Sequence, residues 1–426
     1  MPSADPVYRL DTLPGGLRIA TAAMPHMASV SLGIWVGVGG RFEPLPLNGV
    51  SHFIEHMLFK GTRQRNAREI SEAVEGIGGY LNAFTSEENT CFFTRAHHER
   101  LEETLDVLAD MFLNSVFDPR EIKKEREVIK EELAMYLDQP AQHVQELLNT
   151  AVWPDQPLGR PLTGSNESLD YLKRQHFIDY MDSHYVEGST VVAAAGNVRH
   201  ETLVELVKKR FRRLRKGTQP DFSPAVEKQT RPAVHLHTKN AEQTQIALGV
   251  RTCSRHDPRR HALRLLNAVL GENMSSRLFQ SLREDKGLAY NIGTSLSFWA
   301  DVGDLVVSAG VDTSKLEPAV RSTIKEFKRL IAEPVGKAEF QRTRDYVIGQ
   351  MDLTLESTEN HMMHVGEQIL GYGSLTSPQQ IRDRLAKVTP SEMRNAARDF
   401  LRPDRMTLAL VSPRKKAHGL VELLDK

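Results

Sequence analysis

Apolar and polar residues along the chain follow two different periods, and segments of each kind occur in groups. Residues 30–39, VSLGIWVGVG, and residues 189–198, STVVAAAGNV, are short apolar runs that are typical of buried strands. Between them lie longer segments with the apolar spacing of helices, such as 120–137, REIKKEREVIKEELAMYL. Strands and helices that are grouped rather than strictly alternating favour an α+β fold with mainly antiparallel sheets over a doubly wound parallel sheet.

The chain resembles itself when it is shifted by about 215 residues, and this offset is close to half of its 426 residues. Four pairs of segments share the offset: ASVSLGIWVG with TQIALGVRT, LEETLDVLADMF with LEPAVRSTIKEF, the turns at Pro119 and Pro334, and FIDYMDSHYVEGSTVVAAAGNV with MRNAARDFLRPDRMTLALVSP. The repeat predicts two homologous domains of about 210 residues each. We expect an N-terminal domain at 1–216, a polar, proline-containing linker at 217–230 and a C-terminal domain at 231–426.

The composition is that of a globular protein and limits its partners. Hydrophobic residues make up 40% of the chain and charged residues 26%, with 55 Lys and Arg against 55 Asp and Glu. Because nucleic-acid-binding proteins usually have a basic excess, we expect no nucleic acid partner. The basic run KKRFRRLRKG at 208–217 is interpreted as a solvated helix end rather than a nucleic-acid patch. Cys91 and Cys253 are too few for a disulfide framework.

The N-terminal segment contains acidic residues and prolines but no continuous apolar stretch, so it does not resemble a secretory signal. The apolar runs elsewhere are too short to cross a bilayer. These features predict a cytoplasmic protein without a membrane span, and they leave open whether the N-terminus is processed.

Two histidines and a glutamate lie together in residues 49–62, GVSHFIEHMLFKGT. His52 and His56 are four residues apart, so a helix would place both imidazoles on one face, with Glu55 beside them. A hydrolytic metal site needs neutral nitrogen ligands and a carboxylate that takes a proton from metal-bound water. The motif His-x-x-Glu-His supplies all of these within five residues. A surface helix with two unrelated histidines is the alternative.

A third ligand is expected in the acidic helix at 120–137. Its apolar positions form a predicted buried stripe, at Ile122, Val128, Ile129, Leu133 and Tyr136. Glu132 lies against this stripe, Glu125 lies two turns earlier on the same face, and Glu131 points outward. A carboxylate at a buried edge is costly unless it meets a cation, so Glu132 is the better ligand candidate. An ordinary solvated helix would explain Glu131 but not Glu132.

With these residues, the sequence resembles the pitrilysin and mitochondrial processing peptidase family of inverted-motif zinc peptidases, and it is most similar to the short bacterial members. The resemblance rests on HFIEHMLFKGT, on EREVIKEEL, on the position of Glu132 76 residues after His56, and on the duplicated half. It implies one zinc ion per chain, held by His52, His56 and Glu132. It also implies that Glu55 is the general base and that Glu125 supports the site from behind the ligands.

The second half of the chain lacks these ligands. The offset places residues 267–271 opposite the histidine motif and Val347 near the position of the third ligand, and none of them is a suitable metal ligand. Instead, SSRLFQSLREDKGLAYNIG resembles the family's Arg-x6-Tyr pair, here Arg283 and Tyr290. The resemblance implies that Arg283 bonds a peptide carbonyl and that Tyr290 donates to the developing oxyanion. Without it, Arg283 would be interpreted as a surface residue and Tyr290 as a core aromatic.

Residues 76–93, GIGGYLNAFTSEENTCFF, resemble the family's substrate-binding edge strand, with Asn82 and Ala83 at the matching positions. An exposed strand edge can bind a peptide as an additional strand through main-chain hydrogen bonds. An ordinary hairpin explains the same residues.

Together these features predict a zinc metalloendopeptidase that cleaves peptides or unfolded segments, with Glu55 activating a zinc-bound water. The family encloses this site in a clam-shell chamber of four such domains, so a chain of two domains would need a partner. A homodimer is the simplest assembly, because this chain carries both the zinc motif and the Arg/Tyr pair, and a heterodimer with a related subunit is the alternative. The rival function is a non-catalytic core or substrate-recognition subunit of the same family.

Charge is distributed unevenly along the chain. Residues 1–207 contain 18 Lys and Arg against 30 Asp and Glu, a net charge of −12, and residues 208–426 carry +12. An acidic chamber wall would favour peptides that carry Lys or Arg. We therefore expect a basic peptide substrate.

Overall fold

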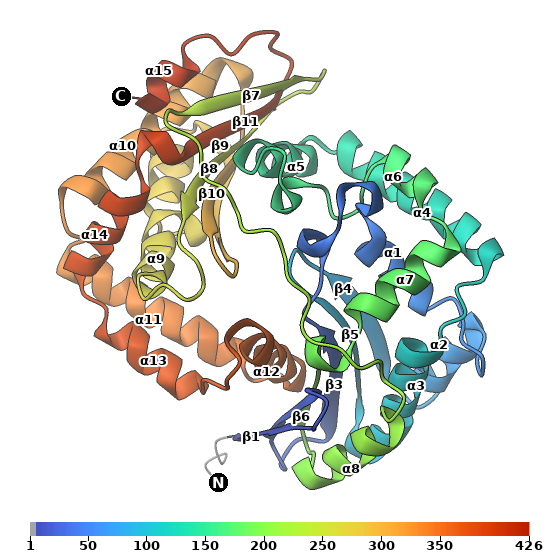
Figure 1. The fold of residues 1–426 in the computed structure, drawn as a ribbon. Helices are drawn as coiled ribbons and strands as arrows, with labels where there is room; N and C mark the ends of the chain where they lie inside the picture. The colour runs from blue at the N-terminus through green and yellow to red at the C-terminus, as the bar shows by residue number, and fades with distance from the viewer. Residues whose placement is uncertain (1–5, 426) are drawn as a thin grey trace. The chain divides into compact units, whose positions relative to one another are not determined.

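The computed structural model describes residues 6–425, which form two compact units that are each built from three segments. The first unit runs to Leu133 and also contains Arg160–Ser223 and Asp352–Ser377. The second unit contains Ala134–Gly159, Pro224–Met351 and the residues from Pro378 onward. Each unit has one sheet with helices packed on it (Figure 1). Residues 217–230 contain no helix or strand, and the predicted domain boundaries stay a prediction.

The sheet of the first unit has six strands in the order β1-β2-β6-β3-β5-β4. The strands are β1 (Val7–Thr12), β2 (Arg18–Ala23), β3 (Ser29–Val36), β4 (Tyr80–Thr85), β5 (Thr90–His97) and β6 (Thr190–Gly196). β2 and β6 are parallel, and all other neighbours are antiparallel. β3 and β6 are buried on both faces, which explains why their sequences are apolar at nearly every position.

Helices from the first half of the chain pack around one face of this sheet. They are α1 (Val50–Leu58), α2 (Ala67–Glu75), α3 (Leu101–Asn114), α4 (Pro119–Asp138), α6 (Asn166–Tyr171), α7 (Arg174–His184) and α8 (His200–Arg210). The apolar side chains of α2 form a separate cluster with α3. Those of the other helices share one buried core with the strands, in which Phe53 of α1 and Leu105 of α3 pack with Ile34 of β3. This core fixes α1 and α4, the two helices on which the metal ligands are predicted.

The opposite face of the same sheet is covered by α12 (Thr358–Tyr372), a helix from the second half of the chain (Figure 1). Met362 and Ile369 of α12 are buried in one cluster with Trp35 of β3. The helix approaches closely, because a Cβ on Gly366 would lie 2.2 Å from the Trp35 ring. Packing against the sheet therefore requires glycine at this position.

The sheet of the second unit has the order β7-β11-β8-β10-β9. Its strands are β7 (Ala233–Thr238), β8 (Thr244–Thr252), β9 (Ala289–Phe298), β10 (Gly303–Val311) and β11 (Met406–Ser412). β7 and β11 are parallel, and the other neighbours are antiparallel. The one parallel pair occupies the place that β2 and β6 have in the first sheet.

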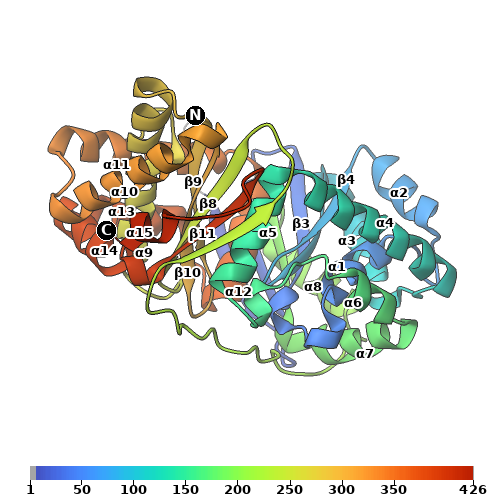
Figure 2. The same ribbon diagram turned by 90° about the horizontal axis from the view of Figure 1, so that it is seen from above.

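One face of the second sheet is covered by α5 (Pro140–Val152), a helix from the first half of the chain (Figure 2). Leu148 and Val152 of α5 are buried with Ala247 of β8 and Ala409 of β11. The remaining helices of this unit are α9 (Arg260–Asn267), α10 (Leu316–Ala332), α11 (Lys337–Thr354), α13 (Pro378–Lys387), α14 (Pro390–Phe400), α15 (Leu420–Asp425) and two π-helical segments, Ala268–Glu272 and Phe279–Asp285. The two halves thus exchange one helix each.

The predicted fold class is confirmed: the chain is α+β, with two similar domains whose mainly antiparallel sheets pack with helices. One detail of the predicted stripe on α4 is wrong. Ile122 and Ile129 are buried, but Val128 is 49% exposed, because the buried face of α4 runs through Glu125 and leaves Val128 beyond its edge. Within residues 6–425, no helix combines the length and the apolar character that crossing a membrane requires.

Candidate metal centre

α1 presents the histidine motif at the edge of the first core. Val50, Phe53 and Met57 recur at helical spacing and are fully buried, so they fix the side of α1 that faces the core. His52 and His56 are left on the neighbouring face, where their ring centroids lie 4.7 Å apart. Local sequence spacing therefore determines the relation of the two imidazoles.

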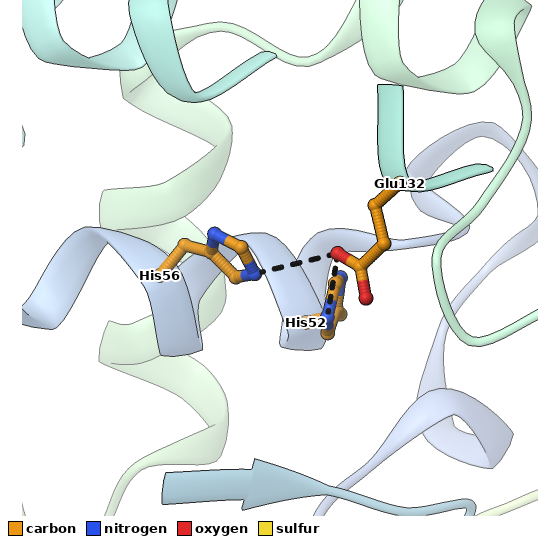
Figure 3. Close-up of side chains that lie close together, drawn as sticks. All are labelled: His52, His56 and Glu132. Carbon is orange, nitrogen blue, oxygen red and sulfur yellow. Dashed lines mark ion pairs between the residues drawn. The ribbon is translucent and has the colours of Figure 1, made fainter. Parts of the chain in front are cut away.

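α4 brings Glu132 to the two histidines (Figure 3). Its Oε2 lies 3.8 Å from Nε2 of His52 and 3.8 Å from Nε2 of His56. One possible ligand atom from each residue lies within 4.8 Å of the others, and this is the one group of its kind in the part of the chain that the structure describes. The structure thus brings the three predicted ligands together, while their binding of a metal stays a prediction.

The donor set fits zinc. Nitrogen–oxygen separations of 3.8 Å are too long for hydrogen bonds. They are close to the ~3.3 Å between two ligands of a tetrahedral zinc ion, given bonds of about 2.0–2.1 Å. Two imidazoles and a carboxylate are a known donor set of catalytic zinc sites, in which the fourth position stays open. Burial and the neighbouring His56 lower the pKa of His52 to about 4, so this ring is neutral at pH 7, as metal binding requires.

Glu55 lies beside the ligands on the same helix. Thr85, at the end of β4, donates a hydrogen bond of 2.6 Å from Oγ1 to Oε2 of Glu55. Burial raises the pKa of Glu55, and the Thr85 hydrogen bond and the charge of His56 oppose this shift in part. A raised pKa makes the carboxylate a stronger base, which suits a group that takes a proton from water. Its role as general base stays a prediction, and Thr85 is a supporting residue that the sequence did not indicate.

Glu125 contacts His56 at the ring nitrogen that faces away from Glu132. Its Oε2 lies 3.1 Å from Nδ1 of His56, and its Oε1 forms an ion pair of 2.7 Å with Nζ of Lys60. Burial alone would raise the pKa of Glu125, but the hydrogen bonds from His56 and Lys60 outweigh it and leave the pKa below its usual value. This contact orients Nε2 of His56 toward Glu132. Lys60 was not among the predicted site residues.

Glu43, a carboxylate that was not among the predicted site residues, lies behind the start of α1. It is 2% exposed and accepts hydrogen bonds from the backbone N–H groups of Gly49 and Ser51, at 2.7 and 2.8 Å, and from Nδ2 of Asn48 at 3.1 Å. These bonds satisfy donors at the N-terminus of the helix that carries the histidines. The signal in the sequence was a single acidic residue within the apolar stretch from β3 to α1.

Asn82 and Ala83 lie on β4, the last strand of the first sheet. Over its whole length β4 pairs with β5, and among the described residues it forms one of the two edges of the sheet, with β1 at the other. Asn82 is exposed and Ala83 is half-buried. The geometry is that of the predicted edge strand, and substrate binding there stays a prediction.

Arg283 and Tyr290 belong to the second unit, whereas the candidate metal ligands belong to the first. Arg283 lies in the π-helical segment before β9, and its guanidinium carbon is 5.9 Å from the centroid of the Tyr290 ring. Tyr290 is 76% exposed, so the alternative interpretation of this residue as a core aromatic is wrong. The structure brings these two residues together with each other, and their contact with substrate stays a prediction.

Comparison with known proteins gives two family matches. A family model described as Insulinase (Peptidase family M16) matches residues 18–166, and one described as Peptidase M16 inactive domain matches residues 171–347. The first match contains the histidine motif and Glu132. The second covers most of the half in which the described residues include no such group.

Relatives of nearly the same length are named zinc proteases. An uncharacterized zinc protease of Mycobacterium tuberculosis is 36% identical over 429 residues, which cover 99% of this chain and 97% of the relative. The uncharacterized zinc protease YmxG of Bacillus subtilis is also 36% identical, over 94% of this chain and 97% of the relative.

Solved structures show the same fold at low identity. A protease from Helicobacter pylori has a TM-score of 0.89 and 20% identity, with coverage of 96% of this chain and 100% of the other. A chain of complex III2 from Candida albicans has a TM-score of 0.84 and 16% identity, with coverage of 98% and 99%.

Two α+β units together with the inverted histidine motif are characteristic of one class of metallopeptidases. Within that class, the chain belongs to peptidase family M16. The resemblance stated from the sequence is therefore confirmed.

Proposed function

We propose that this chain is a zinc-dependent endopeptidase that cleaves peptides or unfolded segments. The observation that carries the proposal is the convergence of His52, His56 and Glu132, with Glu55 next to them on α1. The names of the relatives support the reaction class. One group of ligands among the described residues corresponds to one zinc ion per chain.

The chain's own residues have distinct tasks in this proposal. Bound by the two histidines and Glu132, zinc supplies Lewis acidity, which makes a water more acidic and polarises a carbonyl. The Glu55 carboxylate accepts the proton of the attacking water and delivers it to the nitrogen of the leaving amine. Thr85 orients that carboxylate, and Glu125 keeps the ring of His56 in position.

Substrate binding is proposed at two places. A peptide adds to the free edge of β4 beside Asn82 and Ala83, through main-chain hydrogen bonds that depend little on its sequence. Arg283 then bonds a peptide carbonyl, and the exposed hydroxyl of Tyr290 donates to the oxyanion. In a homodimer, the second unit of one protomer would supply these groups to its partner, and a heterodimer with a related subunit is the alternative assembly.

The rival proposal is a non-catalytic subunit, and the likeness to a chain of complex III2 is the observation that favours it. Such a role makes no use of a metal site. This chain has a histidine, a glutamate and a second histidine in the motif, together with Glu132, in a geometry that fits zinc. The presence of all these side chains favours a catalytic role over that of a non-catalytic subunit.

The decisive test is Glu55→Gln, which keeps the size of the side chain and removes its ability to take a proton. Bound zinc should stay at one per chain, and peptide cleavage should fall by about 10²–10⁴-fold. The matched control is Glu131→Gln, because Glu131 is an exposed glutamate of α4 near the site. Zinc content by atomic absorption and cleavage of a random peptide library are the two measurements.

The outcomes separate the two proposals. If Glu55→Gln cleaves as fast as the parent, the assignment of the general base is wrong. If the parent neither holds zinc nor cleaves any peptide of the library, the non-catalytic role replaces the proposed function.

A further inference from the structure

A pocket of about 570 Å³ lies on the first unit, and its lining contains none of the candidate metal ligands. It is formed by the turn after α1, by one side of α3 and by the basic segment that ends α8. Its charged lining residues include Arg63, Asp106, Asp110, Arg210, Arg212 and Arg213. None of these residues has a task in the proposed peptidase reaction.

The two carboxylates of the pocket are fully engaged by the protein itself. Asp110 is 4% exposed and accepts hydrogen bonds from Thr62, Arg65 and Asn114, at 2.7, 2.8 and 2.8 Å. Asp106 pairs with Arg65 at 2.6 Å and also with Arg210. The two carboxylates thus neutralise the guanidiniums of Arg65 and Arg210. They leave no negative charge for the other arginines of the pocket.

Three guanidiniums of the lining stay uncompensated. Arg215 pairs with Asp182, and Lys209 lies 3.9 Å from Glu102. By contrast, Arg63, Arg212 and Arg213 form no ion pair with any residue that the structure describes. Like charges that share a pocket repel one another unless an anion lies between them.

The segment that carries two of these arginines is anchored rather than loose. Phe211 is 3% exposed and Leu214 is 5% exposed, and both belong to the core of the first unit. The Phe211 ring lies 6.1 Å from that of Phe112 on α3. The backbone of the intervening residues, Arg212 and Arg213, is therefore held in place beside the pocket by buried neighbours on either side, which lowers the entropic cost of ordering this segment around a ligand.

We propose that this pocket binds a small anion that carries two or more phosphate groups. Guanidinium groups match the geometry of phosphate oxygens through paired, charge-assisted hydrogen bonds. Three uncompensated charges and a pocket of about 570 Å³ suit a compact ligand of high charge density. Residues 1–207 carry a net charge of −12, which would repel a long polyanion that extends beyond the pocket.

The test measures binding of inorganic tripolyphosphate to the purified full-length chain by isothermal titration calorimetry at low salt. We expect binding by the parent and a loss of affinity of about tenfold or more in Arg212→Gln/Arg213→Gln. Arg63→Gln, from a separate segment, should weaken binding as well. Both changes are at exposed side chains, and circular dichroism checks that the fold is kept.

The matched control is Lys208→Gln/Lys216→Gln, which removes the same charge from the same basic run but from side chains that do not line the pocket. It should bind tripolyphosphate as the parent does. Absence of binding by the parent overturns the proposal, and so does an equal loss in both double variants. Tighter binding of a single-stranded oligonucleotide than of tripolyphosphate would also overturn it, in favour of an extended nucleic-acid surface.

Discussion

At the scale of residues, the two histidines of the candidate metal centre are held in different ways. Nδ1 of His56 contacts Glu125, whereas Nδ1 of His52 is buried and has no hydrogen-bond partner among the described residues. The ring of His56 is therefore oriented by a hydrogen bond, and that of His52 by packing. Lys60 does not contact the candidate metal ligands and reaches them indirectly, through its ion pair with Glu125.

This arrangement predicts an effect of Lys60→Met, which keeps the length of the side chain and removes its charge. Glu125 loses its ion pair and holds His56 less firmly, so we expect zinc affinity to fall by about tenfold. Competition with a chromogenic chelator measures the dissociation constant. Lys123→Met, at an exposed lysine of α4, is the control, and equal affinities in the two variants would contradict the role of Lys60.

The sequence predicted those site residues whose relation is local. His52, Glu55 and His56 lie within five residues on one helix, so helical geometry alone places them. Glu132 could be distinguished from Glu131 because the apolar stripe of α4 marks one face. Thr85 and Glu43 reach the site through tertiary contacts, which periodicity does not encode. Lys60 lies four residues after His56, and that spacing was a usable signal.

At the scale of elements, the close approach of α12 to β3 is the most demanding contact. We expect Gly366→Ala to destabilise the first unit by about 1–3 kcal/mol, because the added methyl group meets Trp35. Gly349→Ala in α11 is the control, since its added Cβ would meet no described atom within 4 Å beyond its own stretch of helix. Helix propensity should stabilise that variant by up to ~1 kcal/mol. Urea unfolding followed by tryptophan fluorescence measures both, and the same sign of change in both would contradict the packing argument.

The docking of α12 should also depend on pH through His361. This residue is 4% exposed, its Nδ1 lies 3.1 Å from the hydroxyl of Tyr8, and burial together with the charge of His364 lowers its pKa to about 4. The unfolded chain, with a pKa near 6.5, binds more protons than the folded one between these values. Stability should therefore be full above pH 6.5 and decline by up to ~3 kcal/mol as the pH falls toward 4.

Urea unfolding of the parent and of His361→Gln across this pH range measures the contribution. The variant cannot titrate at this position, so its stability should depend less steeply on pH. Parallel curves for the two proteins would exclude His361 as the source of the dependence.

Element types could be predicted from the sequence, but their partners could not. Apolar spacing on residues 358–372 indicates a helix with a buried face, and it does not say which sheet that face meets. The repeat predicts two homologous halves, and it gives no sign that α5 and α12 each pack against the sheet of the other half. Apolar faces of two homologous halves are alike in chemistry, so only shape complementarity at residues such as Gly366 selects the pairing.

At the scale of the whole molecule, the opposite charges of the two halves should select substrates. The first half carries −12, so a peptide rich in Lys and Arg should be cleaved faster than an acidic peptide of the same length. The ratio of the two kcat/KM values should shrink as salt rises from about 0.01 to 0.5 M, because salt screens exposed charges. A neutral peptide is the control, and equal cleavage of all three peptides at low salt would refute the preference.

The exchange of α5 and α12 also has a consequence for the time order of folding. Chains fold as they are synthesised, domain by domain from the N-terminus, when each domain is contiguous. Here the sheet next to the histidine helix gains the cover on its second face only after residues 358–372 have left the ribosome. The unit that begins first is thus completed near the end of synthesis, and until then the apolar side chains around Trp35 depend on other protection from water.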